Sequence, residues 1–152
     1  FSLRSKSVMV VARIWMRLTV PDSWADRSMI TWVAPAAPGY KVLPNLLCSR
    51  GELQSGETLD GFVNRQLKEL MGQVKNFDLI SRLNVEFGGR PAVELIFAMK
   101  PQSVTLKQRQ LFFQVDPARP LVNTVVATAA RENYDELAPV FEGIIQSVTW
   151  NN

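Results

Sequence analysis

The sequence contains no histidine and only one cysteine among its 152 residues. Without histidine the chain cannot assemble a Ser-His-Asp triad or a Cys-His dyad. Zinc sites built on histidine are excluded for the same reason, and a single thiol excludes sites built on cysteines alone. Cys48 cannot form a disulfide within the chain, which suits a reducing compartment. We therefore expect no enzyme, no catalytic residues and no metal site.

Long apolar runs and clusters of basic residues are missing as well. No stretch approaches the roughly 20 apolar residues that span a bilayer. Arg4 and Lys6, followed by the apolar run from Val8 to Ala12, faintly resemble a signal peptide, but the run is short and Arg13 follows it directly. We therefore expect a cytoplasmic protein. The 17 Lys and Arg residues are scattered and exceed the acidic residues by only three, so we expect no nucleic-acid partner.

The overall amino-acid composition is that of one globular domain. Hydrophobic residues make up 47% and charged residues 20% of the chain, which is ordinary for a folded protein. A chain of this length suits one domain with one core. We find no internal repeat, low-complexity tract or linker, and so treat residues 1–152 as a single domain.

The spacing of apolar residues predicts strands and two helices. Thr58 is a candidate N-cap for a helix whose apolar stripe has i, i+3, i+4 spacing and which should end near Asn76. A second helix is expected over residues 135–148, with Pro139 near its first turn, where it could break the helix. Strands are predicted over residues 12–20, 28–34, 41–50, 79–87, 91–99, 105–115 and 121–130.

The order of these elements predicts the fold class. Consecutive strands with short connections favour an antiparallel sheet, and two helices make this an α+β layer fold. We expect about six or seven strands packed with two main helices. Residues 121–130 are apolar on both faces, as in a central strand that is covered on both sides.

Gln66 is the most informative single residue because it lies inside the apolar stripe of the first helix. A buried amide costs roughly 1–3 kcal/mol if it is unpaired. Either the neighbouring backbone pairs it, as happens for most buried polar groups, or this part of the helix faces an open groove and the amide awaits a ligand. On the residues alone, the first interpretation is favoured by roughly two to one.

For two of the predicted strands, the sequence also leaves open whether one face is a binding surface. Gln108, Gln110 and Gln114 alternate along residues 105–115, and neither face of that strand is cleanly apolar. They form either a solvated face or a surface that hydrogen-bonds a bound segment. The stretch from Ser28 to Val33 has large apolar groups on both faces. It is either an exposed patch of the kind that marks interfaces or a strand between two layers.

Three motifs resemble the Eag chaperones of type VI secretion: Leu18-Thr-Val-Pro-Asp-Ser-Trp24, Asp26-Arg-Ser28 and Asn64-Arg-Gln-Leu67. These chaperones belong to a wider group of small domains (DUF1795) that includes DcrB and has a fold like PsbP and Mog1. The similarity extends from about Arg17 to Trp150. Residues 1–15 fall largely outside it, as an N-terminal extension would. DcrB-type members are lipoproteins whose signal ends at a cysteine, and Cys48 lies too deep in the chain for that.

The resemblance implies a cytoplasmic, homodimeric chaperone without a cofactor. Such a protein binds the N-terminal transmembrane helices of a membrane-active, Rhs-type effector and shields them before the effector is loaded onto the secretion spike. By motif position, Gln66 and Gln110 correspond to polar cargo contacts. Met29, Thr31 and Val74 fall where the family lines its apolar groove, although Thr31 departs from the expected aliphatic residue. The alternative is a non-catalytic scaffold or assembly factor of the same fold with a soluble protein partner.

Overall fold

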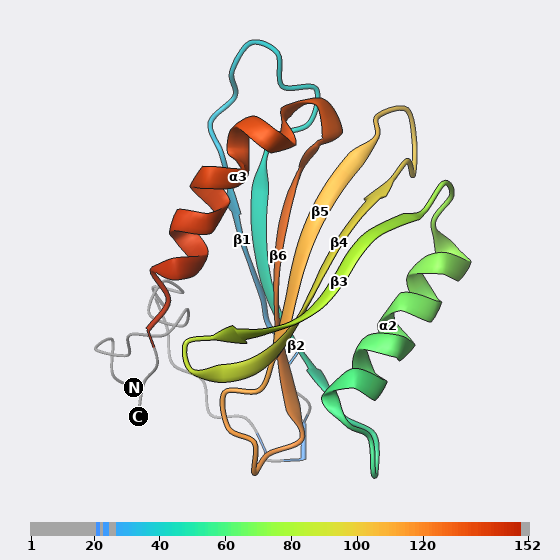
Figure 1. The fold of residues 1–152 in the computed structure, drawn as a ribbon, viewed down its shortest axis with the longest axis vertical. Coiled ribbons are helices and arrows are strands. Elements are labelled where there is room, and N and C mark those ends of the chain that lie inside the picture. Colours follow the sequence, from blue (N-terminus) through green and yellow to red (C-terminus); the bar gives the residue numbers. More distant parts are fainter. Residues whose placement is uncertain (1–20, 22, 25–26, 150–152) are drawn as a thin grey trace.

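The computed structural model describes residue 21, residues 23–24 and residues 27–149, so the strand expected over residues 12–20 lies outside the described part. The described chain forms a six-stranded antiparallel sheet in the order β1-β2-β6-β5-β4-β3, with two helices. Figure 1 shows α3 on one side of the sheet and α2 on the other. This confirms the expected α+β class. The elements are β1 (Met29–Val33), β2 (Asn45–Glu52), α2 (Leu59–Gln73), β3 (Asp78–Phe87), β4 (Arg90–Met99), β5 (Leu106–Phe113), β6 (Leu121–Ala130) and α3 (Arg131–Gln146).

Helix α2 begins where its cap predicts. The Oγ1 of Thr58 accepts a hydrogen bond from the N–H of Gly61 at 3.1 Å, which satisfies one of the unpaired donors of the first turn. The helix ends at Gln73, close to the expected end at Asn76. Asn76 has a φ of 56°, and this left-handed conformation cannot continue a right-handed helix.

Helix α3 begins earlier than expected, at Arg131 rather than residue 135, so Pro139 lies inside the helix and not near its first turn. The residue before the helix, Ala130, makes no side-chain cap hydrogen bond, which is why the sequence carries no start signal there. Pro139 removes one N–H donor but does not break the helix. Burial of one helix face holds α3 together, through Tyr134, Leu137, Phe141 and Ile145.

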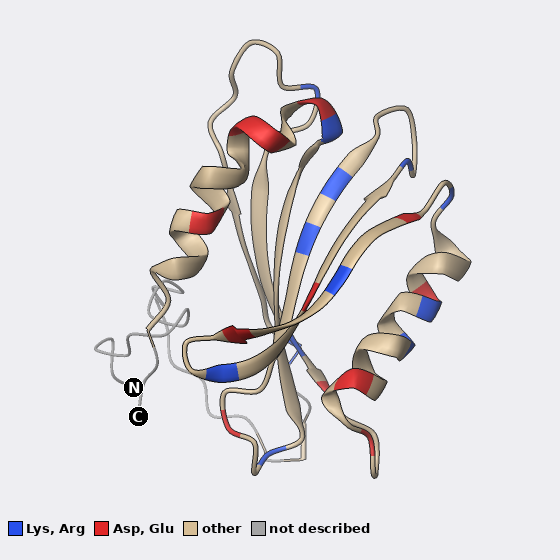
Figure 2. Cartoon of the chain, in the orientation of Figure 1, with Lys and Arg blue, Asp and Glu red and all other residues tan. Residues whose placement is uncertain are grey.

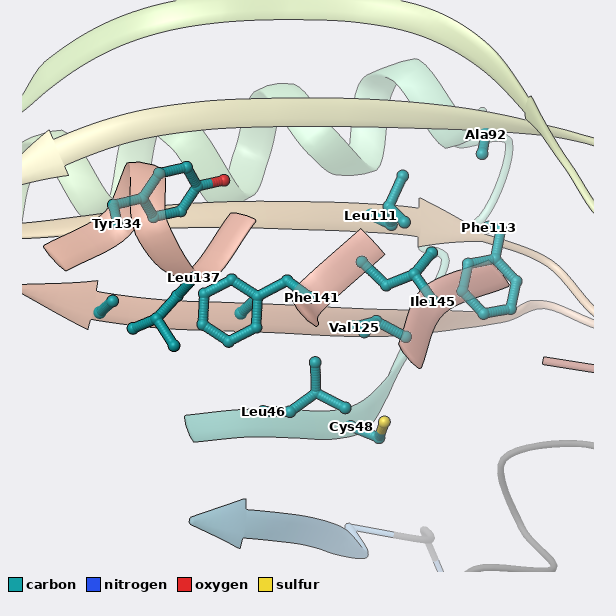
Figure 3. Packing of buried hydrophobic residues seen from close by; sticks show 12 residues of the cluster. Leu46, Cys48, Ala92, Leu111, Phe113, Val125, Tyr134, Leu137, Phe141 and Ile145 are labelled. Atoms are coloured by element: carbon teal, nitrogen blue, oxygen red, sulfur yellow. The ribbon is translucent and has the colours of Figure 1, made fainter. Parts of the chain in front are cut away.

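The sheet carries a separate apolar core on each face. On the α3 face, Leu137 and Phe141 pack with Leu46 and Val125 of the sheet, as Figure 3 shows. The core on the α2 face consists of Phe62, Val63, Leu67, Val93, Leu95, Phe97, Phe112 and Val122. Strand β6 lies inside the sheet and supplies residues to both cores, as predicted for a central strand, but its α2 face is covered only in part, because Val126 belongs to neither core. Cys48 is buried in the α3-side core, and burial raises the pKa of its thiol to about 11.

A cluster of three charged side chains joins α3 to the sheet, and charged residues are also spread over the other helices and strands (Figure 2). The guanidinium of Arg109 in β5 lies 2.8 Å from the carboxylate of Glu94 in β4 and also contacts Glu142 in α3. Arg109 and Glu94 are mostly buried, whereas Glu142 is about half exposed. Hydrogen bonds from Gln146 and Arg109 lower the pKa of Glu142, so its carboxylate stays ionised.

Candidate functional site

The α2 face of the sheet is covered over only part of its width. Helix α2 packs mainly against β4 and β5, at the side of the sheet away from β1 (Figure 1). On the same face, Met29 and Val33 of β1 are 66% and 56% exposed. Leu47 of β2 and Val126 of β6 are only half-buried and belong to neither core cluster. The described residues therefore leave an open floor over β1, β2 and β6, with α2 as its side wall.

The strand register arranges the side chains of this floor in three rows that run across the strands. The outer two rows are rich in hydroxyl and amide groups, and the middle row carries aliphatic side chains at its centre. From β1 to β5, the rows are Val33-Asn45-Thr128-Gln108, Thr31-Leu47-Val126-Gln110 and Met29-Ser49-Thr124-Phe112, of which Thr128 is buried and Phe112 belongs to the α2-side core. An apolar segment placed on this floor would therefore contact aliphatic groups at its centre and hydrogen-bonding groups on either side.

Gln110 stands at the end of the middle row, on the α2 face, and is half-buried. Its Nε2 donates a hydrogen bond to the Oε1 of Gln108 at 3.2 Å, which leaves further donors and acceptors on both amides. The structure thus decides the face of β5 that the sequence left open: Gln108 and Gln110 face the floor, and Arg109 faces α3. Gln114 does not join them, because its Nε2 donates to the carbonyl of Arg119.

Gln66 lies on the side of α2 that faces the floor. It is half-buried and, with Arg27, Ser49 and Thr124, lines an open-sided hollow of about 530 Å³. Its amide forms no hydrogen bond with the described residues. The described part of the chain therefore shows no internal partner for the Gln66 amide.

Of the remaining predicted site residues, Met29 and Thr31 lie on the floor and Val74 does not. Met29 and Thr31 are exposed on the floor, so among the described residues no second layer covers this face of β1. Val74 is the C-cap of α2, eight positions after Gln66 and therefore roughly 12 Å further along the helix axis. The structure brings Met29, Thr31, Gln66 and Gln110 to one surface and leaves Val74 at the far end of its wall.

Sequence reasoning missed Leu47 and Val126, which form the apolar centre of the floor. Only the pairing of β2 with β6 and of β6 with β5 shows that they adjoin Gln110 on one face. A one-residue slip in register would move them to the other face, so no signal within the individual strands could have found them.

Within the described residues, no group of three or more His, Cys, Asp or Glu side chains could hold a metal ion. None of the described helices is long and apolar enough to cross a membrane.

The sequence and the fold of this chain were compared with those of known proteins. The model of the family described as DcrB matches residues 16–147. Effector EagT6 of Pseudomonas aeruginosa is 30% identical over 113 residues, which cover 74% of this chain and 77% of that protein. The crystal structure of PA94, a Pseudomonas aeruginosa protein of unknown function, has a TM-score of 0.77 at 24% identity and covers 89% of this chain and 91% of its own. Cyanobacterial PsbP of Synechocystis has a TM-score of 0.54 at 14% identity and covers 81% of this chain and 82% of its own. This similarity confirms the expected PsbP-like fold.

Proposed function

Since the chain belongs to the DcrB family and resembles EagT6 within it, we propose that it is a chaperone for an effector of type VI secretion. Its cargo is the N-terminal transmembrane helices of a membrane-active effector, and it has no catalytic activity. The observation that carries this proposal is the open floor on the α2 face, with Leu47 and Val126 at its centre and two available amides, Gln66 and Gln110, at its side.

The floor suits an apolar helix for two physical reasons. The half-buried aliphatic side chains gain roughly 25 cal/mol for each Å² of apolar surface that a bound helix removes from water. A helix also has unpaired N–H groups at its start and unpaired C=O groups at its end. The Gln66 and Gln110 amides each offer a donor and an acceptor, so they can pair with these groups or with small polar side chains in the cargo. Such pairing would fix the register of a helix that apolar contact alone would let slide.

The protein acts in the cytoplasm, where it binds the cargo and shields it until the effector is loaded onto the secretion spike. A transmembrane helix of about 20 residues is apolar on all sides, whereas one open floor covers one side only. Two copies of the chain could cover more of it, and a two-fold dimer is the commonest soluble assembly. We therefore expect a homodimer.

Co-expression tests the proposal. The N-terminal segment of an effector encoded beside this gene should be soluble with the wild-type protein and insoluble without it. Replacing Gln66 and Gln110 together by Ala should weaken binding by about 2 kcal/mol, or roughly thirtyfold, because each amide contributes on the order of 1 kcal/mol. The melting temperature should stay near that of the wild type, since Gln66 has no hydrogen-bond partner among the described residues and the Gln110 amide bonds there only to the half-buried amide of Gln108.

Gln114→Ala is the matched control, because the amide of Gln114 bonds to the carbonyl of Arg119 and does not face the floor. Equal solubility of the segment with and without the protein would contradict the chaperone role. A double mutant that melts earlier but binds normally when folded would remove the amides from the binding site. Binding of soluble peptides and not of the apolar segment would favour a scaffold with a soluble partner.

A further inference from the structure

Arg65, next to Gln66 in α2, joins three segments of the chain. Its Nε donates a hydrogen bond to the Oε2 of Glu57 at 3.0 Å, and its Nη2 donates to the Oε1 of Glu57 at 2.7 Å. The same Nη2 donates to the carbonyl of Glu52 at 3.1 Å. Because Glu52 ends β2 and Glu57 lies in the loop before α2, one guanidinium ties the helix to the loop and to the end of a floor strand.

The carboxylate of this pair is well shielded. The side chain of Glu57 is 12% exposed and that of Arg65 is 29% exposed. Glu57 also accepts a hydrogen bond from the N–H of Gln54 at 3.1 Å. The hydrogen bond from Arg65 lowers the pKa of Glu57, and the hydrogen bond to Glu57 raises the pKa of Arg65, so both groups remain charged. A lysine has no planar fork and could not form the same two-pronged contact.

Phe62 sets how closely α2 approaches the end of β2. Its ring is 4% exposed and lies beneath the guanidinium of Arg65, with a distance of 5.0 Å from the Arg65 Cζ to the ring centroid. The ring rests against Gly51 so closely that a Cβ at Gly51 would lie 2.7 Å from its Cζ. Gln66 follows Phe62 by one helical turn and lines the same hollow as Gly51 and Phe62. The contacts that fix α2 to the end of β2 therefore lie within one helical turn of the Gln66 amide.

We propose that Arg65 is a positioning residue for the binding site: it clamps α2 to β2 and so holds the Gln66 amide at the distance from the floor that cargo requires. This inference rests on the proposed function, in which Gln66 contacts cargo. Arg65 itself is directed towards Glu57 and Glu52 and acts through its neighbour. Its effect on binding should consequently disappear when the Gln66 amide is absent.

The other flank of α2 provides a matched control. Arg82 of β3 donates from Nη1 to the Oδ1 of Asn64 at 2.5 Å, and its Nη2 lies 3.5 Å from the Oδ1 of Asp60. Arg82 therefore holds the same helix to the sheet on the side away from the floor. A mutation there tests whether any loosened arginine contact on α2 affects binding.

The experiment is a double-mutant cycle with a fluorescent peptide probe, an Ala- and Leu-rich helix of about 20 residues with Gly and Ser at its centre. Arg65→Met should weaken probe binding about tenfold, and Arg65→Lys should not restore it. In the Gln66→Ala background, Arg65→Met should change the affinity less than about twofold. Arg82→Met should not show this dependence on Gln66.

Amide hydrogen exchange of the free protein supplies a readout that needs no ligand. Arg65→Met should speed exchange in the first two turns of α2 by about tenfold while leaving the sheet protected. Unchanged exchange, or an Arg65→Met effect on affinity that is as large without Gln66 as with it, would overturn the clamp. A wild-type protein that fails to bind the probe, with exchange altered as expected, would instead overturn the proposed function and leave the clamp as a feature of the fold.

Discussion

Replacing Val126 by Asp should weaken cargo binding by at least about a hundredfold and leave the protein folded. Val126 lies at the centre of the floor, between Leu47 and Gln110, and belongs to neither core cluster. In the free protein the new carboxylate can stay hydrated at this half-open position. A bound apolar helix would remove that water without supplying a partner, and burying an unpaired charge costs several kcal/mol.

Two control variants separate the effect of the charge at position 126 from the effects of a shorter side chain and of a charge elsewhere. Val126→Ala shortens the same side chain without adding charge, so its effect on affinity should stay within about tenfold. Val140→Asp adds the same charge on α3, where Val140 is 54% exposed on the other side of the sheet, and should bind as the wild type does. Affinity for the effector segment and melting temperature should be measured on all three. Normal binding by Val126→Asp would show that cargo does not lie on the floor.

Replacing Arg109 by Met should lower the free energy of unfolding by about 2–3 kcal/mol. The substitution leaves the carboxylate of Glu94, whose side chain is only 12% exposed, without the guanidinium that now lies 2.8 Å away. It also removes the contact between Glu142 and the sheet. Loss of a fully buried partner costs roughly 3–5 kcal/mol, and the partial exposure of Glu142 reduces that value here. Urea unfolding measures the change.

Lys107→Met is the control for Arg109, since Lys107 is on the same strand and has only weak contacts with α3: Asp135, 96% exposed, lies at 3.8 Å, and the ring centroid of Tyr134 lies 4.6 Å from its Nζ. It should change stability by no more than about 1 kcal/mol. Adding Glu94→Met to Arg109→Met should recover part of the loss, because the unpaired charge is then gone. No recovery would mean that Arg109 stabilises the fold by its packing rather than by its charge.

The same cluster predicts a dependence on pH. The pKa of Glu142 is lowered below its usual 4.5, first by the hydrogen bond from Gln146 and then by that from Arg109. A lowered pKa in the folded state means that the stabilisation is complete above the usual value and is lost as the pH falls below it. Arg109→Met should therefore lose less stability than the wild type between about pH 5 and pH 3.

The fold could be predicted because its signals are local. The cap at Thr58, the apolar stripe of α2 and the two apolar faces of β6 depend on residues near one another in the sequence, and the structure contains all three. The start of α3 could not be found because Ala130 provides no side-chain cap. There, burial against the sheet, which is a long-range interaction, extends the helix beyond its local signal.

The candidate site was only partly predictable because it depends on pairing between distant strands. The position of Gln66 within an apolar stripe indicated that its amide either has an internal partner or faces a groove. Only the hollow that it shares with Ser49 and Thr124 shows what the amide faces. Arg109 and Gln110 are adjacent in sequence and lie on opposite faces, one holding α3 and the other facing the floor. Alternation alone separates such neighbours but does not say which of the two faces is open.

Photo-cross-linking tests the central claim most directly, namely that the floor on the α2 face holds the cargo helix. A benzophenone side chain is placed at Thr31, exposed on the floor, and in a second variant at Val140, exposed on α3. Each variant is co-expressed with the effector's N-terminal segment and irradiated. We predict a cross-link to the apolar segment from Thr31 and none from Val140. Cross-linking from Val140 alone, or equally from both positions, would contradict the claim.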